Sequence, residues 1–123
     1  MVPPGPPPDP PVWLSATAVE EWRRLAPILA EYGWLTSLDQ TAFAALCEAY
    51  ADFVESDRDV RRFGRLVRDR GVARVSPVLR IRNTALETYM QLAREFFLTP
   101  SSRGRAGVSA PPPPDDPAAR YLR

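Results

Sequence analysis

The chain of 123 residues has no histidine, no lysine and a single cysteine, Cys47. One cysteine cannot form an intramolecular disulfide. Without histidine, neither a zinc cluster nor a cysteine–histidine catalytic pair can be built. Cys47 falls in the middle of a helical pattern, where a cysteine usually packs as a small apolar residue. The composition therefore favours a reducing compartment and predicts no metal and no cofactor.

Other signals are absent as well. No apolar run approaches the length of a membrane span, and the N-terminus has neither a basic leader nor the apolar core of a signal peptide. The six glycines are scattered and form no phosphate-binding loop. No histidine can act as a base for Ser101 or Ser102. We expect a soluble, intracellular protein that is not an enzyme.

Proline is abundant but unevenly placed. Seven of the fifteen prolines lie within residues 1–11 and five within residues 111–117. Such segments lack backbone donors and favour extended, solvated conformations. We therefore predict disordered Pro-rich arms at 1–12 and 106–123 around one foldable domain at 13–105. A domain of this size often gains further burial by self-association.

All sixteen basic residues are arginine, and charge is unevenly distributed. Residues 1–56 hold eight acids and two arginines, whereas residues 57–82 hold nine arginines and three acids. The guanidinium group offers a planar fork that matches phosphate or carboxylate. An acidic first half is thus joined to a basic middle, and that polarity calls for a partner.

Helical periodicity predicts an all-α fold, a helical hairpin or small bundle of about four helices. The first helix should start at Ser15 or Thr17 and stop at Gly33, with a kink or break near Pro27. The second should start at Thr36. Its end is open, because Ser56-Asp57 either starts a new helix or is crossed by one long helix.

The third pattern, residues 57–70, is the clearest amphipathic one, with Val60, Phe63 and Val67 opposite its arginines. Val72–Val75 is a β-prone link that forms either a loop or one small strand. Ser76-Pro77 opens the last long helix. The face of that helix that we expect to be buried consists of Ile81, Ala85, Tyr89, Leu92, Ala93 and Phe96.

The arginine stripe has two interpretations. Forked cations on one helical face form an electrostatic footprint for nucleic acid. Alternatively, the stripe is the solvated side of a helix, or it pairs with the acidic half within or between subunits. The candidate DNA-binding residues are Arg58, Arg61, Arg62, Arg65 and Arg68, extended by Arg74, Arg80 and Arg82.

Four aromatic residues lie outside the main apolar stripes or at helix ends: Trp13, Trp34, Phe96 and Phe97. They either close the core or form the seam of an oligomer.

Several short motifs follow one another in a characteristic order. They are Trp22-Arg-Arg-Leu-Ala-Pro27, Gly33-Trp-Leu-Thr-Ser-Leu-Asp39, Leu46-Cys-Glu-Ala-Tyr50, Ser76-Pro77 and Leu98-Thr-Pro-Ser-Ser-Arg103. This order resembles the small subunit of tailed-bacteriophage terminases. The residues that match the family pattern are Trp22, Leu25, Leu35, Asp39, Cys47, Tyr50, Pro77, Leu98, Thr99, Pro100, Ser101, Ser102 and Arg103.

The resemblance implies a helical protein that assembles into a ring-like homo-oligomer in the host cytoplasm. It implies binding of double-stranded viral DNA at the packaging start and delivery to the terminase large subunit, which holds the ATPase and nuclease. No membrane partner is implied. Two rivals stay open, namely a protein–protein adaptor whose basic helix docks an acidic partner, and a monomeric DNA-binding regulator.

The chain departs from the family pattern in four places. Phe97 stands where the family commonly has glycine, and Ser76 where it commonly has histidine. The glycine-rich insert before Pro77 is reduced to Val72–Val75. The N-terminal extension, often basic in relatives, is proline-rich here. If relatives bind DNA through such an arm, the region from Arg58 to Arg82 must replace it.

Overall fold

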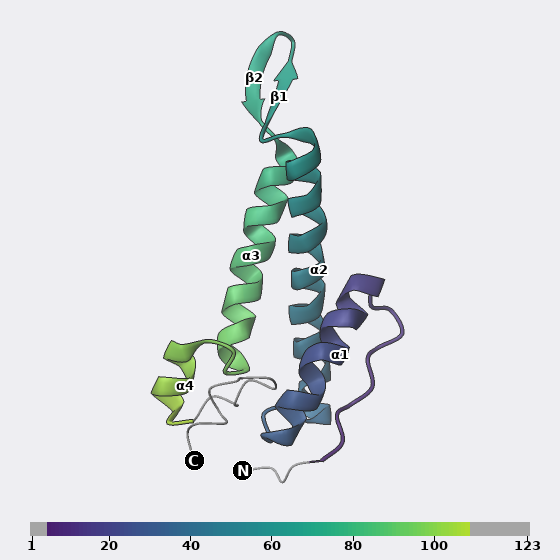
Figure 1. Cartoon of the computed structure of the whole chain (residues 1–123), viewed down its shortest axis with the longest axis vertical. Helices are drawn as coiled ribbons and strands as arrows, with labels where there is room; N and C mark the ends of the chain where they lie inside the picture. Colours follow the sequence, from purple (N-terminus) through teal and green to yellow (C-terminus); the bar gives the residue numbers. More distant parts are fainter. Residues whose placement is uncertain (1–4, 109–123) are drawn as a thin grey trace, which may run out of the picture.

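A computed structural model describes residues 5–108 of the chain. Helices α2 and α3 run side by side as a long antiparallel pair, and a two-stranded β-hairpin caps their far end (Figure 1). Helix α1 packs against the opposite end of α2, and the short helix α4 lies beside the end of α3 (Figure 1). The elements are α1 (Ala16–Glu31), the 3₁₀ turn η1 (Ser37–Asp39), α2 (Gln40–Phe63), β1 (Leu66–Asp69), β2 (Val72–Val75), α3 (Pro77–Glu95) and α4 (Pro100–Ala106).

The helix starts follow from local capping chemistry. The Ser15 hydroxyl accepts a hydrogen bond from the Ala18 N–H at 3.3 Å and so caps α1. Ser76 caps α3 in the same way, with Pro77 at the first helical position. The Asp39 carboxylate accepts from the Thr36 N–H at 3.0 Å, which opens η1 and leads into α2. These three predicted starts are confirmed.

Helix α1 ends as the sequence predicts but does not break inside. Gly33 has a φ of 72° and terminates the helix, since glycine adopts left-handed conformations without steric cost. Pro27 lies within α1, which continues to Glu31. Proline removes one backbone hydrogen bond, and the packing of α1 on α2 outweighs that loss. Of the kink or break predicted near Pro27, the break is therefore wrong.

Helix α2 spans 24 residues and crosses the Ser56-Asp57 boundary without interruption. The Ser56 hydroxyl donates to the Asp52 carbonyl at 2.5 Å, one turn earlier in the same helix. A serine bonded in this way is satisfied inside a helix and starts no new one. The second and third predicted helices are thus one helix. It ends at Phe63, not at Arg70, because Gly64 adopts a φ of 89°.

The segment that follows Gly64 is a β-hairpin, so the all-α prediction is wrong. Strand β1 pairs antiparallel with β2, from Leu66 opposite Val75 to Asp69 opposite Val72. Valine is common on both strands, and its β-branched side chain favours extended backbone. Of the two alternatives for Val72–Val75, the strand is confirmed.

The core lies where α1 and the lower end of α3 meet α2. The ring of Trp22 packs on that of Phe43 at 4.7 Å between centroids, and Phe96 reaches Phe43 from α3 at 5.4 Å. Ala85, Ala93 and Phe96 are buried as predicted, and Tyr89 and Leu92 are partly buried. Ile81 is 56% exposed, so the predicted face of α3 is wrong at its upper end.

Part of the N-terminal Pro-rich segment is attached to the helical body. The Trp22 indole N–H donates to the Pro8 carbonyl at 3.0 Å, and the Gln40 amide donates to the Asp9 carbonyl at 2.9 Å. Residues 5–12 form no helix or strand but lie along this body. Of the predicted tail, residues 109–123 lie outside the described part. Within residues 5–108, no helix combines the length and apolar character needed to cross a membrane.

Candidate nucleic-acid interface

Arginine side chains gather at one end of the molecule. We call residues 57–82 the arginine tip. It comprises the last turns of α2, the β1–β2 hairpin and the first turns of α3, and it contains nine arginines and three aspartates. Helices α1 and α4 lie at the other end of the α2–α3 pair (Figure 1). The basic residues are therefore brought together at the end opposite the aromatic core.

The predicted arginines do not form one helical stripe. They are spread over five segments of the arginine tip, because the helix ends at Phe63. The structure places Arg58, Arg61 and Arg62 on α2, Arg65 before the hairpin, Arg68 on β1, Arg74 on β2, and Arg80 and Arg82 on α3. The predicted helix face of five arginines is wrong, but all eight residues lie at the same end of the molecule.

Two of these arginines are held by one carboxylate. Asp57 accepts a hydrogen bond from Arg61 Nε at 2.8 Å and another from Arg82 Nε at 2.8 Å. The Arg61 hydrogen bond, and then that of Arg82, lower the pKa of the Asp57 carboxyl. Arg82 also lies over the Phe53 ring at 5.3 Å. Arg61 and Arg82 are thus partly neutralised, and the Arg82–Asp57 contact ties α2 to α3 below the hairpin.

The other arginines face solvent with little internal pairing. Arg74 forms an ion pair with Asp69 at 3.5 Å, and both side chains are more than half exposed. Such surface pairs contribute at most about 1 kcal/mol. Arg68 donates to the Gly71 carbonyl at 3.3 Å, a neutral acceptor. Among residues 5–108, six arginines of the tip form no ion pair: Arg58, Arg62, Arg65, Arg68, Arg70 and Arg80.

The arginine tip also exposes apolar side chains. Every residue from 61 to 75 is exposed, and the two strands of the hairpin pair with each other. The exposed apolar residues of this region are Phe63 (69%), Leu66 (61%), Val72 (56%), Val75 (47%) and Val67 (38%). Clustered exposed apolar groups of this kind mark a contact surface.

Arg70 is the residue that sequence analysis missed. It has a φ of 53° and is followed by Gly71 at 81°, so the two form the tight turn between β1 and β2. Arg70 was absent from the candidates because the turn was predicted as the end of a helix. The available signal was an Arg-Gly pair between two short valine-containing runs, since a glycine in a two-residue loop is typical of a hairpin.

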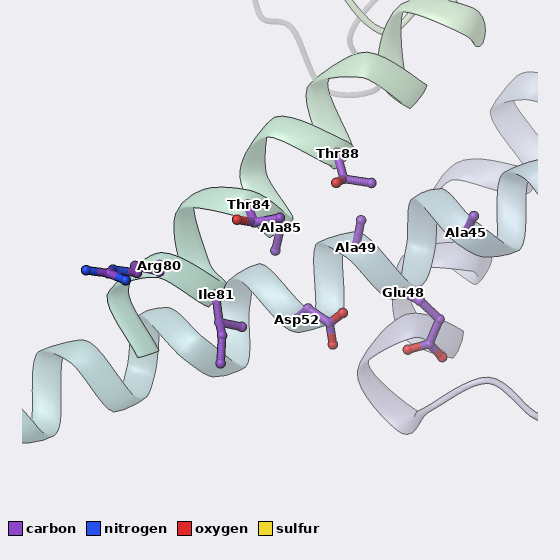
Figure 2. A pocket seen from close by; sticks show the side chains of 9 residues that line it. All are labelled: Ala45, Glu48, Ala49, Asp52, Arg80, Ile81, Thr84, Ala85 and Thr88. Carbon is purple, nitrogen blue, oxygen red and sulfur yellow. The ribbon is translucent and has the colours of Figure 1, made fainter. Parts of the chain in front are cut away.

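A groove between α2 and α3 has a different character. It has a volume of about 530 Å³ and is floored by small side chains such as Ala49 and Ala85 (Figure 2). Arg80 lies at its tip end, whereas Glu48 and Asp52 line its α2 side (Figure 2). Burial raises the pKa of Asp52, and the neighbouring Glu48 and Glu55 raise it further. Two carboxylates disfavour phosphate, so this groove is not the nucleic-acid site.

The four aromatic residues at helix ends behave differently from one another. Phe96 is 5% exposed and belongs to the core. Phe97 packs edge-on against Trp34 at 5.3 Å, and both are half-buried. Trp13 is 61% exposed. Of the two interpretations, core closure applies to Phe96. The Trp13 side chain is exposed, so a partner could contact it.

Most motif residues have visible structural roles. Trp22, Leu35 and Cys47 are buried, Tyr50 packs against Tyr89, and Pro77 begins α3. Burial raises the pKa of the Cys47 thiol to about 12, as expected for an inert packing residue. In the closing motif, Thr99 caps α4 by accepting from the Ser102 N–H at 3.2 Å. The motif residues thus shape and hold together the helices, and all of them except Pro77 lie outside the arginine tip.

Phe97 occupies a backbone position whose geometry favours glycine. The Leu98 N–H bonds to the Ala93 carbonyl at 2.9 Å, closing α3 in a Schellman motif. The residue inside this motif must be left-handed, and Phe97 has a φ of 60°. Arg103 Nη1 donates to the Phe97 carbonyl at 2.8 Å and fixes the turn. A glycine is the residue that this position would ordinarily favour.

No group of three or more histidine, cysteine, aspartate or glutamate side chains within residues 5–108 is arranged to hold a metal ion.

Comparison with known protein families gives one result. Residues 18–112 match the family model described as phage terminase, small subunit. The match covers most of the chain, from α1 to beyond α4. No curated protein and no solved structure matches the chain.

Proposed function

Because the chain belongs to the phage terminase small subunit family, we propose that it is the non-catalytic DNA-recognition subunit of a genome-packaging terminase. In this role it binds double-stranded viral DNA and delivers it to the large subunit, which carries the ATPase and nuclease. The observation that supports the proposal is the arginine tip. It contains nine arginines and only three aspartates, and most of its surface is exposed.

The arginines divide into two groups by their internal partners. Arg61 and Arg82 are bound to Asp57, so their part in the interface is to position the tip as well as to add charge. Exposed arginines without a carboxylate partner, and Arg74 with its exposed surface pair to Asp69, can each neutralise a phosphate and release its counterion. The proposed phosphate contacts are Arg58, Arg62, Arg65, Arg68, Arg74 and Arg80.

Self-association completes the proposal. Trp13, together with Val12 at 103% exposure, leaves an apolar surface near the start of α1. The core is small, and a further interface would bury this surface. We therefore place a seam of a ring-like homo-oligomer at Trp13, with the arginine tip of each copy free to meet DNA.

Charge reversal tests the DNA-binding role. Arg62→Glu combined with Arg65→Glu changes two exposed arginines that make no ion pair within residues 5–108. We expect duplex binding to fall at least tenfold, with circular dichroism unchanged. The matched control is Arg23→Glu with Arg94→Glu, which makes the same charge change at exposed sites outside the tip. Equal loss in both variants, or no loss in the first, contradicts the proposal.

A protein–protein adaptor is the second candidate, and the exposed ring of Phe63 at the end of α2 favours it. In that case an acidic partner would cover the arginine tip. The salt dependence of duplex binding separates the two functions. For a DNA-binding subunit, the logarithm of the affinity for duplex falls steeply and linearly with the logarithm of the salt concentration. An adaptor shows no duplex binding at any salt concentration.

A further inference from the structure

The β1–β2 hairpin forms a separate two-stranded ribbon at the end of the helix pair. Its backbone ladder extends from Asp69 opposite Val72 to Leu66 opposite Val75, and the Ser76 N–H continues it to the Arg65 carbonyl at 2.8 Å. An isolated two-stranded ribbon is only marginally stable in water. Here it is joined directly to α2 and α3, which the Asp57–Arg82 pair clamps together below it. The two joined helices thus support the ribbon, and the side chains of the ribbon are exposed to solvent.

The turn of this hairpin carries backbone strain at an exposed site. Arg70 adopts a φ of 53°, where asparagine, aspartate and glycine are the preferred residues. Strain of this kind costs about 1 kcal/mol and commonly marks functional positions. Among the described residues, Arg70 forms no ion pair. The molecule therefore retains a strained arginine at the far end of its ribbon.

We propose that the β1–β2 hairpin enters the major groove of duplex DNA, with Arg70 directed at guanine base edges. This inference rests on the proposed function and specifies how the DNA is read. The major groove is about 12 Å wide and admits a two-stranded ribbon. The four residues of each strand are separated by three rises of about 3.4 Å and so span about 10 Å, and the groove is about 8.5 Å deep. The tip thus reaches the groove floor while the base stays at the phosphates.

The two faces of the hairpin favour DNA over a protein partner. Residues directly opposite each other share a face, so Leu66, Val75 and Arg68 lie on one side. Val67, Val72, Arg74 and Asp69 lie on the other side, where Asp69 pairs with Arg74 at 3.5 Å. Each face combines aliphatic groups with an arginine, so neither is the uniform apolar surface that packs on a helix. A groove with phosphate walls and thymine methyl groups on its floor suits both chemistries.

Arginines at the base of the hairpin complete the fit. Arg65 comes directly before β1, Arg62 lies in the last turn of α2, and Arg80 lies in the first turn of α3 after β2. With the ribbon in the groove, these exposed guanidinium groups face the flanking sugar–phosphate backbones. They would supply affinity without sequence information, and Arg70 would supply discrimination.

The test uses the full chain and duplexes with altered guanines. Replacing guanine by 7-deazaguanine removes the N7 acceptor from the major groove, and replacing it by inosine removes the amino group from the minor groove. We expect the 7-deazaguanine duplex to bind the wild-type protein about tenfold more weakly, within the range for a base-specific contact. The inosine duplex should bind as the ordinary one does.

The key variant is Arg70→Asn, with Arg62→Ala as the control. Asn-Gly is the preferred pair for this turn, so the variant keeps or stabilises the hairpin. We expect Arg70→Asn to bind 7-deazaguanine and ordinary duplexes equally. Arg62→Ala should weaken all duplexes uniformly, lower the salt slope by about one, and retain the sensitivity to 7-deazaguanine.

The outcomes separate this inference from the proposed function. Salt-dependent binding that ignores 7-deazaguanine, or that falls on inosine duplexes, overturns the groove inference and leaves the DNA-recognition role intact. Binding by Arg70→Asn that keeps the wild-type sensitivity also overturns it. Absence of any duplex binding by the wild-type protein overturns both.

Discussion

The Asp57 carboxylate and the Arg82 guanidinium, 25 residues apart in the sequence, form an ion pair of 2.8 Å that joins α2 to α3. Both side chains are less than one third exposed. The pair lies where the hairpin leaves the helices, so it fixes the direction in which the hairpin projects. It also withdraws cationic charge from the surface that we propose for DNA.

Removing this carboxylate should strengthen DNA binding. Asp57→Asn frees Arg61 and Arg82 for phosphates, so we expect several-fold higher affinity at low salt and a salt slope steeper by about one. Fluorescence anisotropy across a salt series measures both. The control is Asp59→Asn, which removes the same charge from an exposed residue without an ion pair within residues 5–108. An equal gain in both variants would show that the Asp57 pairing is irrelevant.

The same carboxylate makes stability depend on pH. Because the pKa of folded Asp57 is lowered, its stabilising effect is present above the unfolded value of about 3.9 and disappears as pH falls through the folded value. We expect Asp57→Asn to have a lower melting temperature than the wild-type protein at neutral pH. The difference should shrink in acid, below about pH 4. Thermal denaturation of both proteins across this pH range gives the difference in melting temperature. A difference that persists in acid would argue against the pairing.

Phe97 provides a test of backbone strain. Phe97→Ala removes the contact with Trp34 but keeps a side chain at a φ of 60°, whereas Phe97→Gly also relieves the strain. We expect the glycine variant to be more stable than the alanine variant by about 1 kcal/mol. Denaturant unfolding gives the two free energies.

The opposite order is expected at an ordinary helical site. Glu87 is exposed in α3, where alanine should be more stable than glycine by about 1 kcal/mol. If alanine is also the better residue at position 97, the left-handed conformation is not the reason for the family's glycine there.

Trp22 connects the N-terminal segment to the core. Trp22→Phe removes the indole hydrogen bond to the Pro8 carbonyl, worth about 1 kcal/mol, in addition to a packing loss. Removing residues 1–8 should destabilise the wild-type protein more than the Trp22→Phe variant, because the variant has already lost this bond. The four unfolding free energies form a double-mutant cycle. Additive effects would mean that the Pro8 contact stabilises nothing.

Local chemistry made the helix starts predictable. Ser76-Pro77, Thr36 with Asp39, and Thr99-Pro100 each carry their own capping groups, so short sequences sufficed. The segment after Phe63 was misread for a physical reason. Arg65 and Arg68 continue the helical spacing of Arg58 and Arg62, while the same residues also fit a short strand. The left-handed Gly64 decided between the two patterns.

The candidate site was predictable as a concentration of charge but not as a shape. Counting residues located the arginines between positions 57 and 82, whereas the bond from Arg82 to Asp57 depends on how α3 lies on α2. The prominence of Arg70 likewise depends on the turn that places it at the end of the ribbon. Ile81 was misassigned because the far ends of α2 and α3 lack the covering that α1 gives the near end.

The hairpin shares no buried side chain with the core, and this separation has an evolutionary consequence. Substitutions from Leu66 to Val75 alter exposed positions only, so they cost the rest of the molecule little stability. Under the DNA-reading role that we propose for the hairpin, a change of packaging start could be matched by exchanging about ten codons, while the gene segments for α1 and α2 evolve under a different constraint.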